Sequence, residues 1–175
     1  MSVSDRMRYP ETAIALLRIV VGAWFLKAVW TKLTIAYVAG VVPYPAVSAR
    51  FVNFHPKRVA EFAADNPVEW YKAFLQGTVL PHAKLFATLQ AYGEVVVGLG
   101  LLLGLFTGLT AVIGLLLSLN FGLATQWMSF GQQGFHVMLI TSMLIFLATG
   151  AGRRLGLDQL LRARVAKSRW LRWVA

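Results

Sequence analysis

Long apolar runs separated by short polar stretches dominate this chain and predict helices that can cross a lipid bilayer. The first run covers residues 12–33, and a second, residues 85–128, contains a single charged side chain. One span needs about 20 residues, so the second run divides into two helices near the glycine-rich stretch at 104–108. The four predicted spans are residues 12–33, 85–105, 109–128 and 135–151.

Residues 34–84, between the first two predicted spans, are interrupted by prolines and predict short elements outside the hydrocarbon. Asn66, Pro67 and Glu69 form a helix-start signal, with Asn as N-cap, Pro in the first turn and Glu completing a capping box. Aromatic residues that share one helical face follow directly. We expect an amphipathic helix that caps the outer end of the bundle, or alternatively an ordinary packed loop.

Composition and charge indicate an integral membrane protein made of one domain. The chain has 175 residues, a hydrophobic content of 58% and a formal net charge of +10. Soluble domains are about 45–50% apolar. The basic residues gather before the first span and after the last, which places both termini in the cytoplasm, and an even number of spans agrees with this. Nucleic-acid binding is not expected, because no recognition module accompanies the basic residues.

The C-terminal segment, residues 153–175, is basic and contains leucine and tryptophan, which favours a helix on the cytoplasmic membrane surface. Anionic lipid is the expected partner of this tail, and docking onto another subunit is the alternative. The residues expected at the membrane surface are Arg162, Arg164, Lys167, Arg169, Trp170, Arg172 and Trp173. The predicted fold is therefore all-α: a left-handed four-helix membrane bundle with an outer amphipathic cap and a basic cytoplasmic tail helix.

Glu94 is the one charged residue of the second apolar run and the main candidate for a functional group. A charge inside a span costs about 3 kcal/mol even on insertion scales, so Glu94 should be paired or functional. Lys27 and Lys32, near the outer end of the first span, lie within reach, and we expect one of them to pair with Glu94. Gln90 precedes Glu94 by one turn, while Arg18 belongs to the cytoplasmic half of the first span. A static ion pair and a proton-transferring group beside a quinone both fit this pattern.

Gly100, Gly104 and Gly108 recur at four-residue spacing, which predicts a stripe of small residues where another helix packs closely. The same glycines do not form a dinucleotide-binding turn, because they lie inside an apolar span with no preceding strand.

Cysteine is absent, which excludes disulfide exchange, cysteine-ligated clusters and thiolate metal sites. The three histidines are scattered without ligand spacing, so no metal site is expected. A redox role would need a borrowed cofactor that is not covalently attached.

Three stretches of the sequence form a recognisable pattern. They are LLRIVVGAWFLKAVWTKL, with Arg18, Gly22 and Lys32, the segment that starts at NPVEW and runs through GEVVVGLG, and the closing GAGRRLGLD, with Asp158. The chain resembles, over close to its full length, the DoxX-like family of small four-helix membrane proteins. Relatives in that family include the DoxD-type membrane subunit of thiosulfate:quinone oxidoreductase.

The resemblance implies a multi-pass subunit of a quinone-linked oxidoreductase in the bacterial cytoplasmic membrane, with other membrane subunits as partners. Quinone would lie between helices with an oxygen near Glu94, and catalysis by this chain alone is not implied. The alternative is a purely structural accessory subunit of a respiratory or photosynthetic complex, in which Glu94 fixes helix register. A hydrophobic cleft that reaches Glu94 from the lipid side would favour quinone binding.

Overall fold

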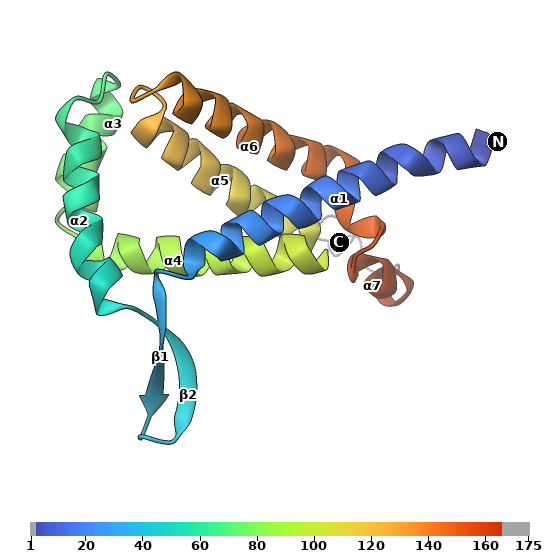
Figure 1. Cartoon of the computed structure of the whole chain (residues 1–175), viewed down its shortest axis with the longest axis horizontal. Helices are drawn as coiled ribbons and strands as arrows, with labels where there is room; N and C mark the ends of the chain where they lie inside the picture. Colours follow the sequence, from blue (N-terminus) through green and yellow to red (C-terminus); the bar gives the residue numbers. More distant parts are fainter. Residues whose placement is uncertain (1–2, 166–175) are drawn as a thin grey trace.

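The computed structural model describes the backbone of residues 3–165 and the side chains of residues 10–161. Four long apolar helices pack together, and each contains a stretch long and apolar enough to span a membrane (Figure 1). They are α1 (Val3–Val29), α4 (Ala83–Leu103), α5 (Thr107–Thr125) and α6 (Phe130–Thr149). The predicted helical membrane bundle is confirmed.

The helix ends differ from the predicted spans by a few residues. The first span ends at Val29 rather than residue 33, because the chain turns there and Lys32 N donates to Val29 O at 2.8 Å. At the next boundary Gly104 adopts the left-handed conformation, with φ +62°, and its N–H bonds the carbonyl groups that end α4. A residue with a side chain is strained in that conformation, so glycine is suited to this position.

A β-hairpin and short helices fill the segment between α1 and α4. Strands β1 (Leu33–Val38) and β2 (Val42–Val47) pair antiparallel, with Leu33 opposite Val47. The chain continues through α2 (Ala49–Ala64), α3 (Glu69–Phe74) and one π-helical turn, Leu75–Val79. Helices α2 and α3 lie across one end of the bundle, here called the cap end (Figure 1). The predicted cap is present, and the mostly helical chain also contains this small hairpin, which the sequence analysis did not predict.

Two side chains tie the cap to α5. Asn66 donates from Nδ2 to Leu123 O at 3.0 Å, and Tyr71 donates from its hydroxyl to Asn120 O at 3.0 Å. Both side chains are buried, and burial raises the pKa of Tyr71 to about 12. Asn66 also accepts from Val68 N, so α3 begins at Glu69, later than the predicted start at residue 67.

The tightest helix contact joins α1 and α4. A Cβ added to Gly22 would lie 2.5 Å from the backbone N of Leu102, and one added to Gly98 would lie 3.0 Å from the backbone N of Leu26. The two backbones therefore touch, as small residues allow in membrane helices.

The three glycines of the predicted stripe lie in three different environments. Gly100 faces Thr110 of α5, Gly104 ends α4, and Gly108 lies in the first turn of α5. They do not form one stripe on one helix, because the left-handed turn at Gly104 reverses the chain between them.

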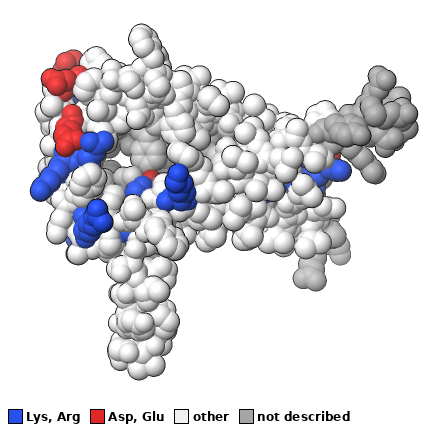
Figure 2. Space-filling view, in the orientation of Figure 1, with Lys and Arg blue, Asp and Glu red and all other residues white. Residues whose placement is uncertain are grey.

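Charged side chains on the visible face gather near the ends of the molecule, while the side of the bundle between them is nearly free of charge (Figure 2). Helix α1 begins and α6 ends at the end opposite the cap, here called the tail end (Figure 1). The tail starts as α7 (Asp158–Val165), and this helix includes residues Arg162 and Arg164. The other residues predicted at the membrane surface lie outside the described part of the chain: Lys167, Arg169, Trp170, Arg172 and Trp173.

Candidate functional site

Glu94 forms an ion pair with Lys32 in the cap-end half of the bundle. Its Oε2 accepts from Lys32 Nζ, and the two side chains are only 3% and 13% exposed. Gln90, one turn earlier on α4, donates from Nε2 to the other carboxylate oxygen at 3.1 Å. Both oxygens of the buried carboxylate therefore have a donor, which a buried charge requires.

Helix α2 covers this pair with two ring side chains. Lys32 Nζ lies 5.4 Å from the centroid of the Phe51 ring, and Phe51 packs edge-on against His55 with ring centroids 5.7 Å apart. Ser48 fixes the approach of α2, since its hydroxyl caps the helix at Phe51 N and its backbone N donates to Lys32 O at 2.8 Å. We call the five residues Lys32, Phe51, His55, Gln90 and Glu94 the Glu94 site.

His55, one of the three histidines that are scattered in the sequence, is buried beside the Lys32–Glu94 pair. It is 7% exposed, and its Nδ1 has no hydrogen-bond partner in the described part of the chain. Burial lowers the pKa of His55, hydrogen bonding to Gln90 opposes the shift, and the positive charge of Lys32 adds to it. The imidazole is therefore neutral near pH 7. Only the packing of α2 on α4 brings it here, and no sequence spacing signals that contact.

Lowering the pH should destabilise the protein through His55. The unfolded chain takes up a proton near the ordinary histidine pKa of about 6.5, whereas the folded state resists it, so stability falls as the pH drops below that value. Thermal unfolding in mild detergent between pH 7.5 and pH 5 should show the fall, and His55→Gln should reduce it. His82→Gln, at the exposed His82, is the matched control. An equal fall in wild type and His55→Gln would contradict this prediction.

The structure does not bring the other predicted cations to Glu94. Lys27 belongs to α1, and its Nζ lies 5.0 Å from the centroid of the Trp24 ring. The helix ends at Val29, and the turn that follows directs Lys32, not Lys27, toward α4. Arg18 is fully buried fourteen residues before Lys32, about 20 Å along a helix. It donates to Leu101 O and, at 2.8 Å, to Leu155 O, so it joins α1 to the tail end of the bundle.

Asp158 is a buried acid that sequence reasoning noted only through the family pattern. Its two carboxylate oxygens accept from Phe106 N at 2.7 Å and Thr107 N at 2.9 Å, and the side chain is fully buried. These N–H groups lie at the start of α5, where backbone donors have no partner within the helix. The N-cap residue of α5 is Phe106, whose side chain makes no capping hydrogen bond. Asp158, the acid of the GLD sequence, therefore caps the start of α5 from a distant position in the chain.

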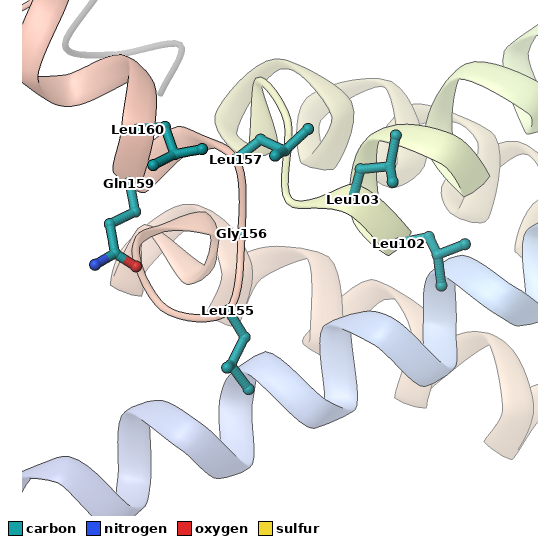
Figure 3. A pocket seen from close by; sticks show the side chains of 7 residues that line it. All are labelled: Leu102, Leu103, Leu155, Gly156, Leu157, Gln159 and Leu160. Atoms are coloured by element: carbon teal, nitrogen blue, oxygen red, sulfur yellow. The ribbon is translucent and has the colours of Figure 1, made fainter.

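An open, apolar pocket of about 470 Å³ lies at the tail end, between the end of α4 and the start of α7 (Figure 3). It is lined by Leu102, Leu103, Leu155, Gly156, Leu157, Gln159 and Leu160. None of these residues belongs to the Glu94 site, and Leu102 lies eight residues beyond Glu94 on α4, about 12 Å along the helix. This pocket is therefore not the lipid-side cleft at Glu94 that would favour quinone binding over a purely structural role. Among the side chains of residues 10–161, no three His, Cys, Asp or Glu are placed to hold a metal ion.

Comparison with known proteins identifies the family. The family model described as the TQO (thiosulfate:quinone oxidoreductase) small subunit DoxD matches residues 14–175, which include most of the first candidate span, the other three candidate spans, the Glu94 site and Asp158. No curated protein and no solved structure matches the chain. The expected resemblance is confirmed: this chain belongs to the DoxD family, the small subunit of thiosulfate:quinone oxidoreductase.

Proposed function

We propose that this protein is the membrane subunit through which a quinone-linked oxidoreductase holds its quinone, with the quinone head group beside the Glu94 site. The observation that carries the proposal is the buried Lys32–Glu94 pair with Gln90 and His55 around it. Charges inside an apolar bundle are costly and mark functional sites by default. A quinone head group has two carbonyl oxygens that accept hydrogen bonds, and the ammonium of Lys32 and the neutral imidazole of His55 are suitable donors.

Reduction of the quinone needs two electrons and two protons. The chain has no cysteine, and its family is described as a small subunit, so we assign the electrons to a partner subunit that oxidises thiosulfate. The residues of the Glu94 site would orient the quinone and carry protons to its oxygens. Each of the two protons would pass from water to Glu94, which is hydrogen-bonded to Gln90, then to Lys32 and from Lys32 to a quinone oxygen, whereas the neutral imidazole of His55 would donate only a hydrogen bond.

The orientation in the membrane is part of the same proposal. Arg153 and Arg154 follow α6 at the tail end, and the positive-inside rule assigns that end to the cytoplasm. The cap and the Glu94 site then lie in the outer half of the cytoplasmic membrane. Thiosulfate is an anion, and a partner subunit that oxidises it outside the membrane would dock on the cap end.

The first test is to purify the protein gently from its native membrane and to identify the accompanying polypeptides and extracted quinone by mass spectrometry. Wild type and the control Lys27→Met should retain quinone and thiosulfate-dependent quinone reduction. Glu94→Gln keeps the shape of the side chain and should lower that activity about a hundredfold, the usual scale for losing a proton-transfer group.

Two results would overturn the proposal. Full quinone content and full activity in Glu94→Gln would make the Lys32–Glu94 pair a static link between helices. Stable association with a large energy-converting complex, with no quinone bound to this chain, would make the protein a structural accessory subunit. The amount of assembled Glu94→Gln protein, measured by gel filtration, separates lost activity from lost folding.

A further inference from the structure

The β-hairpin is exposed and carries no charge. Residues 33–49 contain no Asp, Glu, Lys or Arg, and the hairpin is uncharged throughout its length in the space-filling view (Figure 2). Its exposed apolar side chains are Ile35, Tyr37, Val38, Val41, Val42 and Tyr44. A lone two-stranded hairpin is marginally stable in water, and a large exposed apolar surface marks an interaction site. The hairpin therefore needs something to cover it.

The position of the hairpin relative to the spans indicates what covers it. Leu33 and Val47, at its base, pack against the cluster formed by Phe51 of α2 with Ala87 and Ala91 of α4. Farther along β2, Pro45 O accepts from the Tyr92 hydroxyl at 2.8 Å. These α4 residues lie within the candidate span Ala83–Leu103, so the hairpin adjoins the membrane-spanning part of the bundle.

From this base the hairpin projects away from the side of the bundle, across the direction of α4 rather than along it (Figure 1). In a bilayer crossed by the long helices it would run along the membrane plane rather than through the bilayer. Tyr92 shares an exposed face of α4 with Leu89 and Val96, so the apolar surface of the hairpin continues the surface that the span presents to lipid.

The edges of the hairpin fit lipid better than a partner strand. Pro43 and Pro45 have no N–H, and proline in a strand occupies positions where that N–H would point away from the neighbouring strand. The outer edge of β2 therefore lacks two donors. This loss lowers the cost of an apolar environment and prevents another protein from adding a strand there. The edge of β1 keeps its N–H groups, which need oxygen acceptors that the hydrocarbon centre lacks.

We infer that the hairpin is an interfacial anchor that inserts its apolar side chains where lipid head groups meet acyl chains, in the leaflet at the cap end. Head-group oxygens and water satisfy the β1 edge at that depth. Trp30, Tyr37 and Tyr44 are exposed aromatic residues of the kind that gather at this boundary. The anchor also fixes the depth of the Glu94 site, because Lys32 immediately precedes β1 and bonds Ser48 across the base of the hairpin.

Single-cysteine labelling can test the anchor directly, because the natural chain has no cysteine. Val41→Cys places an environment-sensitive nitrobenzoxadiazole label at the hairpin tip, and Lys57→Cys places it on the exposed side of α2 as the matched control. Both full-length proteins are reconstituted in nanodiscs of phosphatidylcholine and phosphatidylglycerol. The label at position 41 should emit at shorter wavelength, be quenched by nitroxide lipids and resist aqueous iodide. The label at position 57 should behave in the opposite way.

Equal quenching by iodide at positions 41 and 57 in nanodiscs would overturn the inference. Protection of position 41 in native membranes but not in nanodiscs would also overturn it, because a protein partner would then be the covering surface. Tyr44→Cys on β2 repeats the measurement at a second site, so a perturbation by one label does not decide the result.

Discussion

Replacing Lys32 with methionine should destabilise the protein by about 3–5 kcal/mol, the usual cost of removing one partner from a buried ion pair. Glu94 is only 3% exposed, and without Lys32 its charge would keep only the hydrogen bond from Gln90. Reversible unfolding in mixed micelles with a denaturing detergent measures this loss. A change below about 1 kcal/mol would mean that the pair behaves like an exposed one.

A double-mutant cycle measures the energetic coupling between Lys32 and Glu94 separately from their contacts with other residues. Lys32→Met combined with Glu94→Leu should recover most of the lost stability, because apolar residues of similar volume often replace a buried pair without loss. Lys27→Met is the matched control: Lys27 contacts only the Trp24 ring among the interactions described for it, and losing that contact costs about 0.5–1 kcal/mol. Additive effects of Lys32→Met and Glu94→Leu would contradict direct coupling.

The same double variant distinguishes structure from function. If the pair only fixes helix register, the stable double variant should retain quinone and activity. If the Glu94 site acts on quinone, the double variant should fold and yet lose quinone reduction, because it lacks both the ammonium donor and the carboxylate. Stability and activity therefore change in different directions across one set of variants.

The four spans could be predicted from the sequence because a length of apolar residues is a local property. The strands of the hairpin could not be predicted in the same way, because the mostly apolar residues from Leu33 through Val42 are also compatible with the end of a membrane helix. The β-branched residues Ile35, Val38, Val41 and Val42 were the available signal for strands. Apolar length alone does not distinguish a strand from the end of a membrane helix.

The partners of Glu94 were only partly predictable. Reach along the helices limited the cation to Lys27 or Lys32, but the choice depends on where α1 ends and on the bond from Ser48 N to Lys32 O. Arg18 would share a helical face with Lys32 if α1 continued to that residue, but the helix ends at Val29, and the depth of Arg18 places it among the carbonyl groups at the other end of α4. His55 reaches the site only through tertiary packing of α2, which no periodicity reveals.

Replacing Asp158 with alanine is expected to destabilise the protein by about 2–6 kcal/mol, because it leaves one buried and one part-buried N–H group unsatisfied at about 1–3 kcal/mol each. These donors, Phe106 N and Thr107 N, begin α5, and Phe106 lies in the left-handed region at φ 48°. Gly152 packs directly against this carboxylate, since a Cβ there would overlap Asp158 and Thr107.

Asp158→Asn retains one acceptor oxygen and should lose roughly half as much stability as Asp158→Ala. Gln159→Ala, at the next position of α7, should change stability by less than about 0.5 kcal/mol, as exposed substitutions usually do. Unfolding in mixed micelles measures all three variants, and equal stability of Asp158→Ala and wild type would contradict the capping role. Asp158 caps the tail end, whereas Glu94 lies in the cap-end half of α4. The folded fraction of Asp158→Ala should therefore keep its quinone, whereas Glu94→Gln should lose activity without losing the cap of α5.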